Sequence, residues 1–303
     1  MPEPILTDTH VHFWDLQNPD LSYGWLLPDA PRRPPLPDYS SIKCQHYWPE
    51  DFMAESRFSN VGNVIHVQVA VDMKDPVAET RWLQHWADQF GIPQGIIAYV
   101  NLGDPAAQNT IRRHTAFPNL RGIRDLRYDN YLTDDTWKHG YALLQEHDLI
   151  FCDDPLLEVM PDAVALAREF PGITYCVDHA GWPRRRDKDY FREWRDRMRA
   201  LADLPNTVVK ISGLGMSEHR WTTDSIRPWV LECIEAWGSE RSFFGSNWPV
   251  DRLFSSYTDV VNAYAEIVSG FAPSEIKALF SGNADRIFRL AEYRQVDGPT
   301  KAL

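Results

Sequence analysis

The stretch NVIHVQVAV, residues 63–71, is rich in valine and isoleucine and carries apolar residues on both of its alternating faces. A strand of this kind is buried on both sides, which is typical of a parallel sheet covered by helices. Seven similar runs occur along the chain, at residues 5–12, 95–102, 120–126, 149–153, 173–179, 207–212 and 242–247. The pattern predicts eight buried strands.

Longer amphipathic segments separate these runs and predict helices between the strands. The expected helices cover residues 76–90, 105–115, 134–146, 161–170, 189–202, 223–237 and 257–269. Eight strands joined by helical crossovers are what a closed (β/α)8 barrel requires, whereas an open doubly wound sheet usually has fewer. We therefore predict an α/β protein with a single (β/α)8 TIM-barrel domain over residues 1–290.

Two segments fall outside this pattern. Residues 16–51 contain the run PRRPPLPD, which has too many prolines for a helix. We expect a long ordered loop insertion after the first strand, lying over one barrel mouth, with a flexible surface insertion as the alternative. Residues 273–290 predict a closing helix, and residues 291–303 predict a C-terminal tail.

Composition limits the classes of function. The formal net charge of −12 argues against binding to nucleic acid or to anionic membranes, because both require a basic surface. No apolar run approaches the ~20 residues that span a bilayer, and the N-terminus does not resemble a secretion signal. Four scattered cysteines without a CxxC pair predict free thiols. We expect a cytoplasmic protein with a small-molecule partner, and a homo-oligomer is compatible with the sequence.

Reacting groups of a barrel enzyme lie at the C-terminal ends of its strands, so polar residues there are candidates. His10 and His12 stand two positions apart in the first strand and therefore face the same way. His179 ends the predicted sixth strand and would reach the same mouth. Neutral imidazoles suit zinc and similar ions, so these three residues predict a metal or catalytic site. Histidines satisfied in the core or at the surface are the alternative.

Seven motifs follow one another along the chain: THVHFWD, YGWL, LRGIRDL, VDHAGWP, VKISGL, FGSNWPVD and GNADRIFRL. In this order they resemble the amidohydrolase-related family of amidohydrolase 2 type, in its branch of sugar-lactone and 2-pyrone-4,6-dicarboxylate lactonases. The resemblance covers nearly the whole chain. It implies a metal-dependent-hydrolase-like barrel that hydrolyses a ring ester, with one divalent metal in some members and none in others.

One position departs from the family pattern. His10 and His12 match the strand-one pair, and His179 matches the histidine that faces it. Asn247 stands where most members have aspartate, so FGSDWP becomes FGSNWP. A neutral amide is a weak oxygen ligand and cannot act as a base near pH 7. The cofactor therefore stays open between none and one divalent metal, zinc first, bound by the three histidines.

Four residues are candidates for the missing base. His179 comes first, because imidazole accepts a proton near neutral pH. Asp153 ends a predicted strand and comes second. Asp178 and Asp251 are the other two, although strand alternation predicts that Asp178 points away from His179, toward the helices.

Cationic and aromatic residues near the same strand ends are candidate substrate ligands. Arg124 and Arg127 could hold a carboxylate or polarise a carbonyl, with salt bridges to nearby acids as the alternative. Lys210 is expected to pair with an acid. The remaining predicted substrate-binding residues are Gln68 and three tryptophans that either wall the pocket or pack the loops, Trp14, Trp182 and Trp248.

These residues and the resemblance together predict a hydrolase that opens a lactone or related cyclic ester. His10, His12 and His179 would hold the attacking water, with or without a metal, and Asn247 would orient water or substrate. Two alternatives stay open. One is a non-oxidative decarboxylase of an aromatic or unsaturated acid, and the other is a catalytically silent binding protein in which Asn247 marks lost activity.

Overall fold

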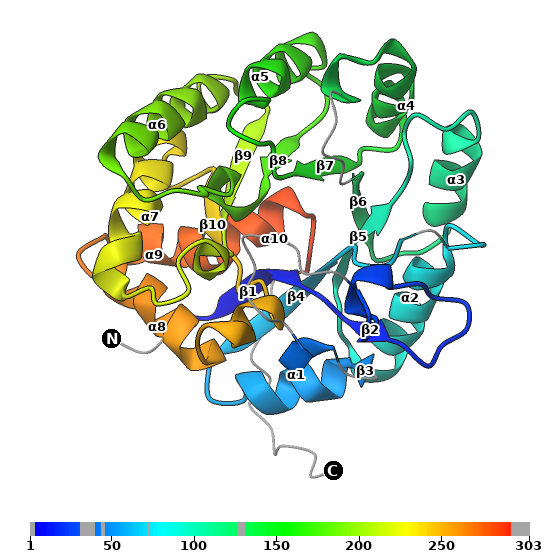
Figure 1. The fold of residues 1–303 in the computed structure, drawn as a ribbon, viewed down its shortest axis with the longest axis horizontal. Coiled ribbons are helices and arrows are strands. Elements are labelled where there is room, and N and C mark those ends of the chain that lie inside the picture. Colours follow the sequence, from blue (N-terminus) through cyan, green and yellow to red (C-terminus); the bar gives the residue numbers. More distant parts are fainter. Residues whose placement is uncertain (1–3, 31–39, 44–45, 72, 126–130, 292–303) are drawn as a thin grey trace.

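Eight parallel strands form the barrel that the sequence predicted (Figure 1). The computed structural model describes residues 4–30, 40–43, 46–71, 73–125 and 131–291. Around the barrel the strands are neighbours in chain order: β1 (Leu6–Val11), β4 (Val61–Val67), β5 (Gly95–Tyr99), β6 (Leu120–Arg124), β7 (Ile150–Asp153), β8 (Tyr175–Val177), β9 (Thr207–Ile211) and β10 (Ser242–Phe244). All carboxyl ends of the strands consequently meet at one mouth.

The first and last strands meet at a seam that closes the barrel. Val11 pairs with Trp248 just beyond β10, and the backbone N–H of His12 donates to the Trp248 carbonyl at 2.8 Å. Lower in the seam, the Thr9 hydroxyl donates to the Phe244 carbonyl at 2.7 Å. The seam satisfies strand edges that would otherwise be exposed, and it fixes β1 beside the segment after β10.

Helices surround the ring of strands (Figure 1). They are α1 (Pro49–Ser56), α2 (Ala78–Phe90), α3 (Ala107–His114), α4 (Asp135–Glu146), α5 (Met160–Glu169), α6 (Lys188–Ala202), α7 (Thr223–Trp237) and α8 (Tyr257–Ile267). Side-chain oxygens of Asp134, Asp187 and Thr222 cap α4, α6 and α7 by accepting a backbone N–H three residues on. In the described part of the chain, no helix combines the length and the apolar character that crossing a membrane requires.

A separate apolar cluster fills the inside of the barrel. Its strand members are Ile65, Val67, Ile97, Ile150, Cys152, Cys176, Val208 and Phe243. Residues two positions apart on a strand share a face, so this cluster identifies which positions point inward. Neighbours such as Phe151 and Tyr175 belong instead to the larger core between strands and helices.

The C-terminal segment closes the end of the barrel opposite the mouth. The helix predicted over residues 273–290 is present as an unbroken succession of α9 (Pro273–Lys277), a π-helical turn at Ala278–Gly282, and α10 (Asn283–Ile287). The wider π turn interrupts the α-helical repeat. Asp285 of α10 accepts hydrogen bonds from Thr7 (2.7 Å) and Asn63 (2.9 Å) near the starts of β1 and β4.

The insertion after β1 contains secondary structure that was not predicted from its proline-rich sequence. Just before it, β2 (Trp14–Asp15) pairs antiparallel with β3 (His46–Tyr47) inside the insertion, and α1 begins at Pro49 as a helix that was not predicted. The Trp25 indole N–H donates to the Val69 carbonyl at 3.3 Å, and Val71 N–H donates to the Ser22 carbonyl at 2.8 Å. These contacts place the described part of the insertion beside the carboxyl end of β4.

A glycine inside α4 provides a test of this packing. A Cβ at Gly140 would lie 2.0 Å from the Leu102 carbonyl oxygen, so the helix can approach the loop after β5 only without a side chain. Helix propensity alone would make Gly140→Ala stabilising by about 1 kcal/mol. We expect the opposite sign, a loss of about 3 kcal/mol from overpacking, measured by urea unfolding. Gly270→Ala, where a Cβ would meet no atom of the described residues within 4 Å, is the matched control. Equal stability of both variants would contradict the packing argument.

Candidate active site

The two histidines of the first strand converge at the mouth of the barrel. Their Nε2 atoms are 3.2 Å apart, and both rings are buried. Nδ1 of His12 lies 2.8 Å from the Val67 carbonyl oxygen, which can only accept a hydrogen bond. Nδ1 of His12 therefore carries the proton, and its Nε2 presents a lone pair toward His10.

An irregularity in β1 separates Asp8 from the histidine pair. The pairing of β1 with β4 shifts between Asp8 and Val11. Asp8 lies on the other side of the irregularity and accepts a hydrogen bond from Tyr257 of α8 at 2.8 Å. Thus the polar residues Asp8 and His10 separate, although they stand two positions apart.

The third predicted histidine lies beside this pair. The ring of His179 is 4.3 Å from that of His10 between centroids, and its Nδ1 is 2.9 Å from Ser212 Oγ. His179 has a left-handed backbone (φ 53°) in a short turn after β8. Gly213 packs against the ring, where a Cβ would come within 2.5 Å of Nδ1 and the backbone is also left-handed (φ 62°). Only glycine suits that position.

Burial keeps these imidazoles neutral. It lowers the pKa of His10, His12 and His179 well below the ordinary value of 6.5, and the positive charges of Arg124 and Lys210 lower it further. At neutral pH all three rings are therefore available as metal ligands or proton acceptors.

The histidine pair fits a metal ion. Two nitrogens bound tetrahedrally at 2.0–2.1 Å from one zinc ion lie about 3.3 Å apart, close to the separation of the His10 and His12 Nε2 atoms (3.2 Å). Together with this pair, His179 does not form a set of three ligand atoms within 4.8 Å of one another. Among the described residues, the one set of three ligand atoms within 4.8 Å of one another is Cys152, Cys176 and Asp178.

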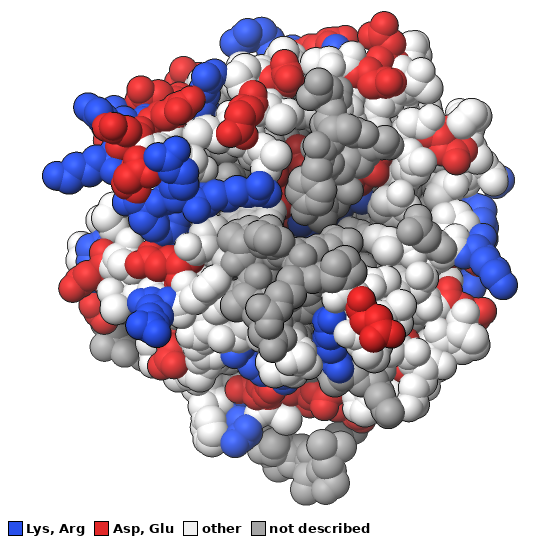
Figure 2. Space-filling model, in the orientation of Figure 1, with Lys and Arg blue, Asp and Glu red and all other residues white. Residues whose placement is uncertain are grey.

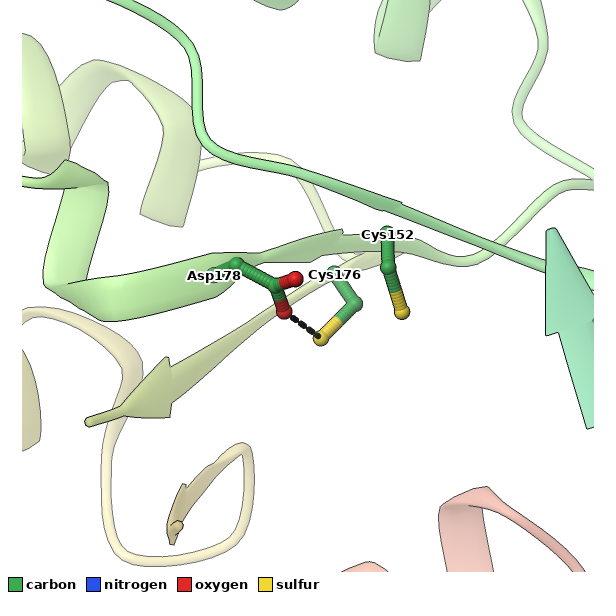
Figure 3. A group of neighbouring side chains, drawn as sticks. All are labelled: Cys152, Cys176 and Asp178. Carbon is green, nitrogen blue, oxygen red and sulfur yellow. Dashed lines mark hydrogen bonds between the residues drawn. The ribbon is translucent and has the colours of Figure 1, made fainter. Parts of the chain in front are cut away.

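Cys152 and Cys176 of that second set belong to the apolar cluster inside the barrel, and Figure 3 shows them beside Asp178. Burial raises the pKa of the Cys176 thiol, and neighbouring Cys152 raises it further, so the thiol is protonated. The Lys210 ammonium already lies 2.9 Å from Asp178 Oδ1. A dication here would have to displace the Cys176 thiol proton and would face an ammonium group, so these atoms are poorly suited to a metal.

The direction of Asp178 corrects a prediction. Its carboxylate does not point toward the helices but lies inside the barrel, fully buried, with Lys210 and Arg124. Positions 176 and 178 share the inward face. It is His179 that leaves the alternation, because its left-handed backbone turns the chain back across the mouth.

The amide of Asn247 is held by an acid four residues later. Its Nδ2 donates to Asp251 Oδ2 at 2.6 Å, and both side chains are buried. Burial raises the pKa of Asp251 to about 7, while hydrogen bonds from Asn247 and from the Gly215 backbone lower it. Asn247 itself is left-handed (φ 60°) and directly precedes the seam residue Trp248.

Asp153, the second candidate base, has both carboxylate oxygens engaged by tyrosines. Tyr131 donates to Oδ1 at 2.7 Å and Tyr175 donates to Oδ2 at 2.5 Å. Burial raises the pKa of Asp153 to about 7, and the neighbouring Asp154 raises it further. Tyr175 belongs to the outer core, so these bonds direct Asp153 away from the histidine pair.

Arg124 reaches the barrel interior, as expected for a residue at the end of β6. Its Nη2 donates to Asp154 Oδ1 at 3.2 Å, and its Nε lies 3.9 Å from Asp178 Oδ2. Its acidic partners thus lie just after β8 and just after β7. Arg127 lies outside the described residues. Gln68, at the end of β4, donates its amide N–H to the Ala70 carbonyl at 2.6 Å.

The three tryptophans occupy different surroundings. Trp14 is fully buried and packs on Trp25 and Tyr47 of the insertion. The Trp248 indole packs on Tyr257, and its N–H donates to Glu55 of α1. Trp182 is partly exposed after β8, with the Arg184 guanidinium 4.1 Å above its ring.

The basic run after Trp182 forms part of a surface with mixed charge. Figure 2 shows Lys and Arg side chains interspersed with Asp and Glu over α6. Arg185 pairs with Asp187 at 2.8 Å, and Arg186 pairs with Glu218 at 2.9 Å. A hollow of about 610 Å³ between α6 and α7 is lined partly by Arg186, and none of the predicted site residues that the structure describes lines it.

A parallel barrel with a buried histidine pair at the end of its first strand and a third histidine beside the pair has the arrangement of a barrel enzyme whose site lies at the carboxyl ends of the strands. The chain belongs to the amidohydrolase family, whose model matches residues 7–290. This confirms the resemblance read from the motifs, including the lactonase-like branch.

Individual relatives are similar over almost their whole length. The chain is 36% identical to uncharacterized protein y4mH of Sinorhizobium fredii, covering 96% of this chain and 100% of that protein. It is 27% identical to an L-fucono-1,5-lactonase of Burkholderia multivorans, covering 94% of this chain and 96% of that enzyme. A B. multivorans amidohydrolase structure with bound zinc has a TM-score of 0.81 at 24% identity, covering 95% and 100% of the two chains.

The pKa of Asp251 predicts a pH-dependent stability. Since the folded-state pKa (about 7) exceeds the ordinary value of 3.8, its contribution is full below pH ~4 and is lost as pH rises through 7. The loss amounts to roughly 4 kcal/mol for a shift of about three units. Asp251→Asn should therefore gain thermal stability relative to wild type between pH 5 and 8. Exposed Asp20→Asn is the control, and parallel curves for wild type and Asp251→Asn would contradict the assignment.

Asn247→Asp should not act as a simple reversion to the family residue. It would place two buried carboxylates 2.6 Å apart, and such a pair cannot both ionise. We expect a lower thermal midpoint at pH 8 for this variant and recovery in the swapped variant Asn247→Asp/Asp251→Asn, which keeps one donor and one acceptor. Wild-type stability of the single variant at pH 8 would show that the Asn247–Asp251 contact is dispensable.

Proposed function

We propose that this hydrolase opens a lactone or related cyclic ester, with a six-membered sugar lactone as the first substrate class to test. The observation that carries the proposal is the convergence of the neutral His10 and His12 rings, 3.2 Å apart, at the mouth of an amidohydrolase-family barrel. The L-fucono-1,5-lactonase relative supports the substrate class.

His10 and His12 would hold one divalent metal ion, zinc first, with His179 the nearest further imidazole. When bound, the ion supplies a Lewis acid that polarises the ester carbonyl and lowers the pKa of a bound water. The zinc-containing B. multivorans amidohydrolase, which shares the fold, supports zinc as the ion to test.

His179 is our choice for the base. Nδ1–H would donate to Ser212 Oγ, 2.9 Å away, which leaves the Nε2 lone pair to take a proton from the attacking water. Water then adds to the carbonyl carbon, and the ring C–O bond breaks as the tetrahedral intermediate collapses. The His179 imidazolium returns its proton to the departing alkoxide, so lactone and water give the hydroxy acid.

Arg124 and Asn247 would orient the substrate. The Arg124 guanidinium is held in the barrel interior by Asp154, so it can donate to a substrate oxygen in a fixed direction. Asn247 has its Nδ2 committed to Asp251, so its Oδ1 is left as an acceptor for a water or a substrate hydroxyl.

The test is acid release from a panel of sugar and aromatic lactones, with added zinc and with a chelator. We expect turnover that falls at least 100-fold in His12→Ala and in His179→Ala, because each removes a group acting on the reacting atoms. His85→Ala, an exposed histidine on α2, is the matched control and should leave turnover unchanged.

Isotope labelling separates the rival reactions. A lactonase incorporates one oxygen atom from ¹⁸O-water into the product carboxylate. Release of carbon dioxide from an aromatic acid without incorporation would replace the proposal with a decarboxylase. Tight lactone binding without turnover, with or without zinc, would identify a binding protein.

A further inference from the structure

A carboxylate lies behind the histidine pair, on the side of His10 away from His12. Asp178 Oδ2 is 3.7 Å from His10 Nδ1, whereas His12 faces Nε2 of the same ring. Asp178 Oδ1 is 2.9 Å from the ammonium of Lys210 on β9. The side chains of Asp178, Lys210 and His10 have no solvent exposure. The three groups form a buried line from β9 to β1.

The facing polar atoms along this line are held by charge rather than by regular hydrogen bonds. Within the described part of the chain, His10 Nδ1, Asp178 Oδ2 and Lys210 Nζ are all buried and form no regular hydrogen bond. A charged group buried without a counter-charge is strongly unfavourable, so Lys210 and Asp178 depend on each other. The remaining oxygen of Asp178, Oδ2, lies 3.7 Å from His10 Nδ1 and 3.9 Å from Arg124 Nε.

We propose that Asp178, held in place by Lys210, is a positioning residue that fixes the proton of His10 on Nδ1. The proposal rests on the proposed function only in taking His10 and His12 as the site residues. A carboxylate accepts hydrogen bonds and cannot donate, so it favours the tautomer with Nδ1–H directed toward it.

The tautomer decides what the histidine pair can bind. With both protons on Nδ1, facing Asp178 and Val67, the two Nε2 lone pairs face each other across 3.2 Å and attract a cation. With the proton on Nε2 of His10, the same atoms form an N–H···N hydrogen bond, and neither Nε2 is left with a lone pair for a cation. Asp178 thus favours the tautomer in which both Nε2 atoms can bind a cation.

Asp178→Asn reverses this preference. The amide oxygen would face Lys210 and the amide N–H would face His10, so Nδ1 of His10 becomes the acceptor and Nε2 carries the proton. Because this variant leaves the Lys210 charge uncompensated, the double variant Asp178→Asn/Lys210→Met is tested beside it. It is neutral and close to the original volume, so its thermal midpoint should recover.

The tautomer is measured directly in metal-free protein with ¹⁵N-labelled histidine, and the His10 signals are assigned by their loss in His10→Gln. Zinc affinity is measured by competition with a chromophoric chelator. We expect Nδ1–H on His10 in wild type, loss of that preference in both variants, and zinc binding that is 10- to 100-fold weaker. The control is Glu169→Gln/Lys138→Met, which removes a surface Lys–carboxylate pair of 2.8 Å and should change neither measurement.

A folded double variant with the wild-type tautomer and zinc affinity would overturn the proposal and leave the pair a purely structural one. A wild type with Nε2–H on His10 would overturn it as well. Absence of lactone turnover in wild type, with the tautomer and affinity results as expected, would instead reject the proposed function and leave the role of Asp178 standing.

Discussion

The closure of β10 onto β1 is the constraint on which the site depends. A parallel barrel has no free edge only when its last strand meets its first, and here the Thr9–Phe244 and His12–Trp248 hydrogen bonds make that contact. The second bond joins a site histidine to the residue directly after Asn247. Parts of the site that lie more than 200 residues apart in sequence are therefore positioned by the same interactions that complete the sheet.

Closure also determines the electrostatics of the interior. Polar groups that point inward at the mouth end lose water, and two cations, Arg124 and Lys210, are balanced by Asp154 and Asp178. The same burial and the same cations lower the pKa of His10, His12 and His179, which keeps the imidazoles neutral. Arg124 and Lys210 therefore influence the site through their charge, which helps to keep the imidazoles at the mouth neutral.

The barrel and the histidine pair could be predicted from sequence because both depend on local patterns. A strand buried on two faces shows this in its composition, and an HxH spacing places two rings on one side of a strand. The direction of Asp178 could not be predicted, because it depends on where β8 ends and on the left-handed backbone of His179. Helix α1 was missed because it is short and begins within the stretch that was predicted to be a loop. The Asn247–Asp251 contact likewise depends on the φ of 60° at Asn247, a backbone angle that sequence periodicity does not predict.

The distance between the His10 and His12 Nε2 atoms is compatible with two arrangements of the ring protons. An N–H···N hydrogen bond and two nitrogens around one ion both give a distance near 3.2 Å. The arrangement depends on the groups that face the two Nδ1 atoms. These are the Val67 carbonyl at His12 and the Asp178 carboxylate at His10. Because neither of these groups can donate a hydrogen bond, each favours a proton on the nitrogen that it faces. The binding property of the pair is therefore set by two acceptors that need not touch what is bound.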